Sequence, residues 1–178
     1  PMEQNTRSKM KLSELQKISK TLSIKDTLIL LAETFPKQVL FSTSFGQEDQ
    51  VISHEIFENN ININVFTLDT GRLFQETYEV HDRTLSKYKK PIDVYYPNHF
   101  LVEELQTAKG PNSFYDSVEN RKECCFIRKI EPLKRALSGG KIWITGLRSA
   151  QSDNRQNLNR FTYDETFNII KYNPLIDW

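Results

Sequence analysis

The stretch that decides the fold is Phe41-Ser42-Thr43-Ser44-Phe45-Gly46-Gln47-Glu48-Asp49. It follows an apolar run over residues 38–41, which predicts a short buried strand, and precedes apolar residues at helical spacing over residues 51–57. The small polar residues therefore fall on a strand-to-helix turn, where backbone N–H groups and the positive end of a helix dipole point outward. This favours a phosphate site, although an ordinary turn capped by serine has the same pattern. The ending of a Walker loop is absent.

Strands and helices alternate along the rest of the chain. Further strands are predicted at residues 63–68, 92–96 and 141–145, and helices at 12–18, 24–35, 73–88, 100–108 and 126–137. The last part, with residues 161–163 and 168–172, favours a hairpin or edge strands. This order predicts an α/β fold with an open, mainly parallel sheet and helices on both faces. We expect a single nucleotide-binding domain over residues 1–178, with residues 1–10 disordered.

Three predicted strands end in small, polar or basic residues, at 42–49, 69–72 and 146–155. In open sheets of this class ligands bind beyond the carboxyl ends of the strands. The sequence therefore predicts a cleft with backbone donors on one side and arginines on the other. Asp49 and Asp69 suit an anion site less well, and for one of them a helix cap or a position behind the ligand is at least as consistent with the sequence as a ligand contact.

Composition and charge narrow the class of protein. The 178 residues are 38% hydrophobic and 26% charged, which is typical of a globular chain, and no apolar run approaches the roughly 20 residues of a membrane span. Two adjacent cysteines cannot form a disulfide framework, and with no signal peptide we expect a cytoplasmic protein. The net charge is +1, but basic residues gather in 121–135 and 141–160. This favours a small anionic ligand over nucleic acid or a membrane, although solvated basic faces would give the same pattern.

The most unusual segment is Arg121-Lys122-Glu123-Cys124-Cys125-Phe126-Ile127-Arg128-Lys129. Thiolates are preferred ligands of iron–sulfur clusters and zinc, and neighbouring cations lower the pKa of a thiol. Two adjacent cysteines supply only half of the four ligands of a cubane cluster, and one buried and one exposed thiol without function is the alternative. The three histidines have no ligand partner nearby, so we expect them on helix surfaces or in the core.

Four motifs in order give the chain a resemblance to a known family. They are Ser44-Phe45-Gly46-Gln47-Glu48-Asp49; Leu68-Asp69-Thr70-Gly71-Arg72; Cys124-Cys125 with Arg128-Lys129 and Pro132-Leu133; and Thr145-Gly146-Leu147-Arg148 with Gln151-Ser152 and Arg155. From about Phe41 to its last residue the chain resembles the assimilatory adenylyl-sulfate reductases. These belong to the adenine-nucleotide alpha-hydrolase-like group, which also holds the phosphoadenylyl-sulfate reductases.

The resemblance implies a role for each motif: a modified phosphate loop, a border of the adenosine, half of the ligands of a [4Fe–4S] cluster, and an arginine loop for the sulfate end. The implied cluster ligands are Cys124 and Cys125. The implied substrate-binding residues are Ser42, Thr43, Ser44, Phe45, Gly46, Asp49, Leu68, Asp69, Thr70, Gly71, Arg72, Lys129, Gly146, Arg148, Gln151, Ser152 and Arg155. For Lys129, a solvated helix lysine is the alternative.

The resemblance also implies a reaction, in which adenylyl sulfate is converted to sulfite and AMP with electrons from thioredoxin or a similar dithiol. The family continues past a motif like residues 172–178 into a portion with a Cys-x-x-Cys pair and a terminal nucleophilic cysteine, whereas this chain ends at Trp178. We therefore expect a truncated chain that binds nucleotide but has no catalytic cysteine, no activity and no complete cluster. Without the cluster, we expect residues 117–129 to be poorly ordered.

Other functions stay open at this point. A 3′-phosphoadenylyl-sulfate reductase would not need the tandem cysteines, which count against it. An adenylating enzyme of the ATP pyrophosphatase type would prefer a phosphate loop with paired glycines. A non-catalytic nucleotide-binding module is a third possibility, and the motifs leave open whether the chain forms a homo-oligomer.

Overall fold

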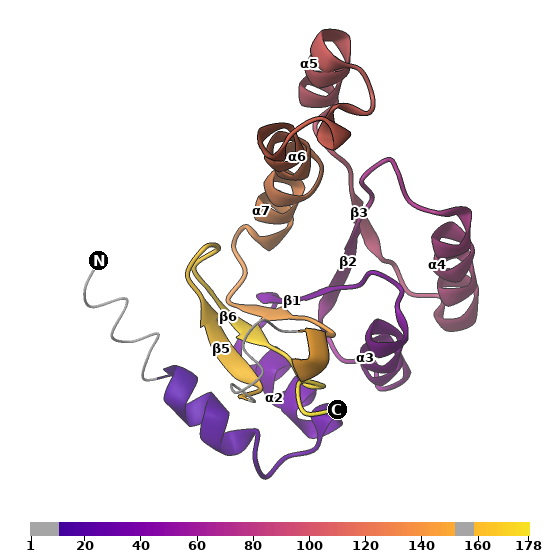
Figure 1. The fold of residues 1–178 in the computed structure, drawn as a ribbon. Coiled ribbons are helices and arrows are strands. Elements are labelled where there is room, and N and C mark those ends of the chain that lie inside the picture. The colour runs from indigo at the N-terminus through magenta and orange to yellow at the C-terminus, as the bar shows by residue number, and fades with distance from the viewer. Residues whose placement is uncertain (1–10, 152–158) are drawn as a thin grey trace.

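A six-stranded sheet forms the centre of the computed structural model, which describes residues 11–151 and 159–178 (Figure 1). The strands are β1 (Val39–Ser42), β2 (Asn64–Leu68), β3 (Asp93–Tyr95), β4 (Ile142–Ile144), β5 (Phe161–Asp164) and β6 (Ile169–Tyr172). They lie in the order β3-β2-β1-β4-β6-β5. Every neighbouring pair is parallel except β5 and β6, which form the expected antiparallel hairpin. The predicted open, mainly parallel sheet is confirmed.

The position of β1 matters most for function. It pairs with β2 on one side and with β4 on the other, through Phe41–Val65 and Phe41–Ile144 in register. The chain therefore leaves β1 in one direction across the sheet and later returns to its other side. In α/β sheets such a reversal opens a crevice at the carboxyl ends of the two strands.

Helices cover both faces, as predicted. On one face lie α2 (Ile24–Thr34), α3 (Gln47–Glu58) and α4 (Gln75–Tyr88), which surround the larger core (Figure 1). Because side chains alternate along a strand, Val39 and Phe41 of β1 point into this core while Leu40 points to the other face. A helical segment over residues 11–18 joins the larger core through Leu15. Ser23 caps α2 by accepting a hydrogen bond from the N–H of Asp26, as its position predicts.

The opposite face carries a smaller core. There α7 (Glu131–Leu137) packs through Ala136 and Leu137 against Leu40, Phe66 and Trp143 of three strands. The helix α7 is short. At the carboxyl ends of the strands, side chains on this same face of the sheet border a pocket, and none of the residues that line it belongs to α7.

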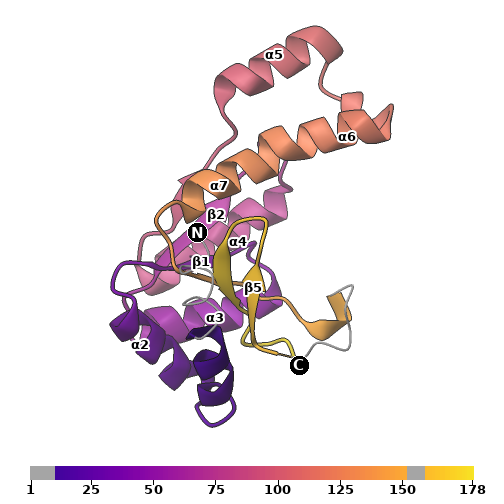
Figure 2. The ribbon, with the colours of Figure 1, turned by 90° about the vertical axis from the view of Figure 1, so that its left-hand side faces the viewer.

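A helical arm joins β3 to β4. It consists of α5 (His99–Lys109), the short 3-10 turn η1 (Ser113–Tyr115), α6 (Val118–Cys125) and the π-helical turn η2 (Phe126–Ile130), which runs into α7. In Figure 2, α5 and α6 project away from the sheet. A final 3-10 turn, η3 (Ser149–Gln151), follows β4.

The arm corrects two expectations. The predicted helix began at Phe126, but helical structure begins at Val118, where the Ser117 hydroxyl accepts a hydrogen bond from the N–H of Asn120 at 3.0 Å. Residues 117–129, expected to be poorly ordered, therefore form a capped helix that continues into η2. No α6 residue is buried, so apolar periodicity could not reveal this helix.

Within the two described parts of the chain, no helix combines the length and apolar character needed to cross a membrane.

Candidate functional site

A pocket of about 440 Å³ lies at the carboxyl ends of β1, β2 and β4, and we call it the strand-end pocket. Its position matches the crevice that the strand order predicts. It is lined by Ser42, Thr43, Ser44, Glu48, Asp49, Leu68, Trp143, Thr145, Gly146, Leu147 and Lys171. Six of these lining residues were expected from the sequence: Ser42, Thr43, Ser44, Asp49, Leu68 and Gly146.

The turn after β1 is held in one conformation by its own side chains. The Thr43 hydroxyl accepts a hydrogen bond from the N–H of Phe45 at 3.1 Å, and the Ser42 hydroxyl accepts one from the Trp143 indole at 2.9 Å. Phe45 has the left-handed φ of 64° and stacks on His81 with ring centroids 4.6 Å apart. Gly46 begins α3 without any side-chain cap, which leaves the first N–H groups of the helix available to a ligand.

Asp49 ties this turn to its own helix. Its buried carboxylate accepts hydrogen bonds from the Ser44 N–H at 2.6 Å and the Ser44 hydroxyl at 2.7 Å. Burial raises the pKa of Asp49, and the hydrogen bonds from Ser44 oppose that rise. Gly146, after β4, lies so close that a Cβ there would collide with the carboxylate. Asp49 thus supports the turn through hydrogen bonds to Ser44, which is consistent with a position behind the ligand.

The loop after β4 brings an arginine to the same edge. Arg148 Nε lies 2.6 Å from Glu48 Oε1, so the first turn of α3 and this loop are joined by an ion pair. The Ser149 N–H donates to the carbonyl of Ile176 at 2.8 Å, which anchors the loop to the last residues of the chain. The other residues expected in this loop, Ser152 and Arg155, lie outside the described residues, as does the side chain of Gln151.

The loop after β2 is shaped by Asp69. This buried carboxylate accepts hydrogen bonds from the Gly71 N–H at 2.8 Å and from the Tyr78 hydroxyl at 3.1 Å. Its hydrogen bond with Tyr96 raises the pKa of that phenol. Gly71 has a φ of 79°, which glycine adopts without strain. Asp69 therefore holds the loop in its conformation.

Two arginines connect the β2 loop to the arm. Arg128, buried in η2, donates to the carbonyl of Thr70 at 2.6 Å. Arg72 points the other way: it donates to the carbonyl of Pro111 and, at 3.0 Å, to Asn112 Oδ1, and its guanidinium lies 4.9 Å from the centre of the Phe114 ring. The structure thus places Thr70, Gly71 and Arg72 outside the lining of the strand-end pocket, although their loop adjoins it through Leu68.

The two cysteines end α6. Cys124 is partly buried and Cys125 is exposed, and Lys129 lies exposed in the next helical turn. Among the residues that the structure describes, no group of three or more His, Cys, Asp or Glu side chains could hold a metal ion. The two thiols are at most two of the four protein ligands that a cubane cluster needs.

Five lining residues were not among the expected binding residues, although Glu48, Thr145 and Leu147 lie inside the motifs that mark the strand ends: Glu48, Trp143, Thr145, Leu147 and Lys171. A signal existed for Lys171, because a lone charged residue stands among Ile169, Ile170 and Tyr172 in a buried strand. Glu48 lay inside a quoted motif but has the wrong charge for an anion site. Its ion pair with Arg148 explains its presence.

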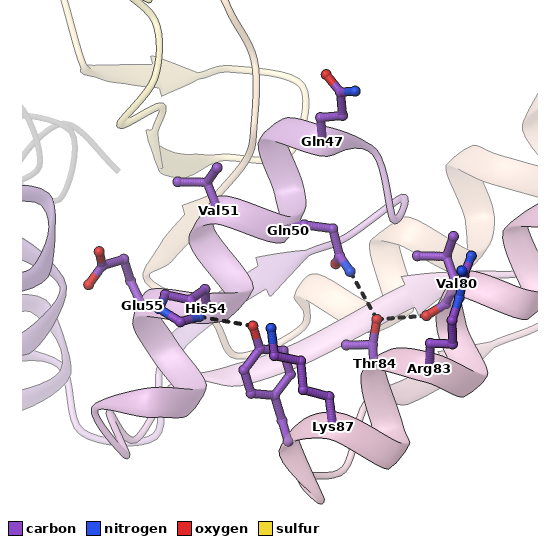
Figure 3. Close-up of a pocket in the computed structure, with 10 residues that line it drawn as sticks. Gln47, Gln50, Val51, His54, Glu55, Val80, Arg83, Thr84 and Lys87 are labelled. Carbon is purple, nitrogen blue, oxygen red and sulfur yellow. Dashed lines mark hydrogen bonds between the residues drawn. The ribbon is translucent and has the colours of Figure 1, made fainter.

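A second cavity of about 490 Å³ lies between α3 and α4 and shares no lining residue with the strand-end pocket. Figure 3 shows Gln50 turned toward Thr84, to which it donates at 3.0 Å. The His54 ring lies 3.0 Å from the Tyr88 hydroxyl. These side chains join the two helices. Of the residues that line this cavity only Gln47 belongs to a strand-end motif, whereas residues of all three strand-end loops or strands line the strand-end pocket, which is therefore the candidate site.

Comparisons with known proteins agree with the family resemblance that the sequence motifs indicate. The chain matches the phosphoadenosine phosphosulfate reductase domain over residues 38–178. It is 43% identical over 141 residues to adenosine 5′-phosphosulfate reductase of Burkholderia cepacia, a match that covers 79% of this chain and 56% of that protein. It is 40% identical over 176 residues to the protein of the same name from Neisseria meningitidis serogroup A, with 93% of this chain and 68% of that protein covered.

The fold is similar to a solved structure of the same group. The crystal structure of phosphoadenylyl-sulfate (PAPS) reductase from Candida auris, in a phosphate complex, matches with a TM-score of 0.78 and 28% identity, over 94% of this chain and 79% of that one. The chain spans only a little over half the length of curated relatives such as the Burkholderia cepacia protein. The family match itself covers most of the chain, so this chain belongs to the phosphoadenosine phosphosulfate reductase domain family.

Proposed function

We propose that the chain is the nucleotide-binding part of an adenylyl-sulfate reductase of assimilatory sulfate reduction, which converts adenylyl sulfate to sulfite and AMP. The observation that carries this proposal is the strand-end pocket, where the turn after β1 meets the loop after β4 in a chain of this family. The tandem Cys124-Cys125, together with relatives named adenosine 5′-phosphosulfate reductase at 40% identity or more, supports the adenylyl-sulfate substrate.

The uncapped start of α3 is the proposed phosphate site. Backbone N–H groups at Gly46 and after it carry the positive end of the helix dipole, which favours an anion. The acidic side chains of this first turn do not cancel that field, because Glu48 is paired with Arg148 and Asp49 accepts from Ser44. We place the adenosine between Leu68 and the Gly146 loop, which line the pocket from β2 and β4.

The sulfate end requires cations near the reacting sulfur. A cysteine thiolate, which we place outside these 178 residues, attacks the sulfur of adenylyl sulfate, AMP leaves with the bonding electron pair, and an S-sulfocysteine forms. A dithiol such as thioredoxin then attacks the enzyme sulfur, sulfite leaves, and the second thiol closes a disulfide and frees the cysteine. Negative charge moves onto AMP in the first step, so we assign Arg148, Arg155 and Lys129 to stabilise it. In this arrangement Arg148 contacts the substrate through its remaining N–H donors while it stays paired with Glu48.

We further propose that Cys124 and Cys125 supply two thiolates of a [4Fe–4S] cluster, the other two coming from outside these residues. Lys122, Arg128 and Lys129 stand within a few residues of the pair and would offset the negative charge of such a cluster. The step at sulfur is a thiol reaction and is not routed through the cluster. Thioredoxin-type dithiols operate in a reducing compartment, and we place the protein in the cytoplasm.

A 3′-phosphoadenylyl-sulfate reductase is the second candidate, since the solved neighbour from Candida auris carries that name. Titration calorimetry with AMP, adenylyl sulfate, its 3′-phosphorylated form and ATP separates the candidates. We expect adenylyl sulfate to bind most tightly and AMP next. Tightest binding of the 3′-phosphorylated form would support the second candidate. Tightest binding of ATP, or of no nucleotide, would overturn both.

A further inference from the structure

Lys171 has an unusual position for a lysine. It lies in β6, an interior strand of the sheet, directly between Trp143 of β4 and Thr162 of β5. Its neighbours Ile170 and Tyr172 are buried in the larger core, so Lys171 points to the other face, where it lines the strand-end pocket. A long, flexible cation in such a strand is costly unless it has a partner or a ligand.

The surroundings of Lys171 supply little compensation for its charge. Its Nζ lies 4.5 Å from the centre of the Trp143 ring, a cation–π contact between two residues that line the pocket. Burial lowers the pKa of Lys171, and the more distant charge of Asp164 only partly opposes this. In the described parts of the chain, no carboxylate lies within ion-pair distance of it.

Lys171 is the cation that faces the strand-end pocket. Among the described lining residues it is the only basic one, and both acidic ones are engaged elsewhere, Glu48 by Arg148 and Asp49 by Ser44. Trp143 connects Lys171 to the turn after β1, because its indole N–H donates to Ser42 while its ring carries the ammonium group. An anion in this pocket would therefore meet backbone donors on one side and an ammonium group on the other.

We propose that Lys171 is a further anion-binding residue of the strand-end pocket, where its ammonium group pairs with the phosphate of a bound adenine mononucleotide. This rests on the proposed function, since it takes the pocket as the nucleotide site. The ion pair restores to Lys171 the solvation that burial removes, and Trp143 keeps the ammonium in place before the ligand arrives.

Titration calorimetry of AMP and adenosine tests the proposal. Lys171→Met keeps the length of the side chain but removes the charge, so AMP affinity should fall about tenfold, as for the loss of one charge-assisted hydrogen bond, while adenosine affinity stays within about twofold. Lys171→Arg should restore most of the AMP affinity. Lys141→Met, at an exposed lysine just before β4, is the matched control and should bind both ligands like the unmodified protein.

The outcomes separate this inference from the proposed function. Unchanged AMP affinity in Lys171→Met, or equal losses for AMP and adenosine in a variant with an unchanged thermal midpoint, would overturn the role of Lys171 while the nucleotide site stands. Failure of the unmodified protein to bind AMP and adenylyl sulfate would overturn the proposed function, and the inference would fall with it.

Discussion

At the scale of single residues, the contact between Gly146 and Asp49 is the tightest constraint on the strand-end pocket. A Cβ at position 146 would collide with the Asp49 carboxylate and lie 3.3 Å from the Asp49 backbone nitrogen. Gly46, in the phosphate turn, is different: its φ is −70°, and an added Cβ would lie 3.7 Å from Ser44 Oγ, an ordinary contact. The sequence analysis named both glycines as binding residues, but only at Gly146 does the geometry require the absence of a Cβ.

Gly146→Ala and Gly46→Ala form a matched pair. We expect Gly146→Ala to lower the free energy of unfolding by about 1–3 kcal/mol, because either Asp49 or the β4 loop must move. Gly46→Ala should cost no more than about 1 kcal/mol, the scale of a change at a helix N-cap. Urea denaturation measures both, and equal losses would contradict the assigned contact.

At the scale of elements, the contacts of Arg72 indicate whether the loop after β2 binds the ligand or holds the helical arm. Arg72 contacts Pro111, Asn112 and Phe114, which all belong to the connection between α5 and α6. Arg72→Ala should therefore speed chymotrypsin cleavage at Phe114 and Tyr115 severalfold, because the loop is released, and leave AMP affinity within about twofold.

Arg83→Ala, at an exposed arginine of α4, is the control for Arg72→Ala and should change neither measurement. Loss of adenylyl-sulfate binding with unchanged cleavage would instead make Arg72 a ligand contact, as the family resemblance implied.

Elements with strong local signals could be predicted from the sequence, and those without could not. Runs such as residues 63–68 and 141–145 are apolar enough to predict β2 and β4 and thereby the parallel sheet. The helix α6 buries none of its residues, so it carried no apolar period, and only the cap at Ser117 marks its start. The expected disorder of residues 117–129 had a different basis, the uncompensated charge of Arg128 and Lys129, and in the structure Arg128 is buried and donates to the carbonyl of Thr70.

The residues of the strand-end pocket also divide into those that could be predicted from the sequence and those that could not. Ser42, Thr43 and Ser44 follow one strand directly, so their place at the sheet edge could be predicted from the strand alone. Trp143 and Lys171 lie beside each other only because β4 and β6, far apart in the chain, pair in one register. The Arg148–Glu48 pair likewise depends on the meeting of two loops from different strands. Such contacts follow from strand order and register, which local sequence patterns do not contain.

At the scale of the whole molecule, the larger core contains a titratable group that links stability to pH. Tyr172 is fully buried, and burial raises its pKa from the ordinary 10.0 to about 12. The folded protein thus holds this proton more tightly than the unfolded chain. The resulting stabilisation is complete below pH 10 and is lost as the pH rises from 10 to 12.

We expect Tyr172 to contribute about 2–3 kcal/mol to the decline in unfolding free energy over that interval. Tyr172→Phe should make the decline shallower by this amount, whereas Tyr115→Phe, at an exposed tyrosine, should leave it as it is. Denaturant titrations from pH 8 to pH 12 provide the comparison. Parallel curves for Tyr172→Phe and the unmodified protein would refute the contribution.

The central claim is that the molecule binds an adenine nucleotide at the strand-end pocket and not in the slightly larger cavity between α3 and α4. Hydrogen–deuterium exchange with and without saturating adenylyl sulfate tests it most directly. The account predicts slower exchange at residues 42–46 and 145–147 on binding, with no change at residues 83–88 of α4. Slower exchange confined to residues 50–55 and 83–88, or an unchanged pattern at residues 42–46 and 145–147, would contradict it.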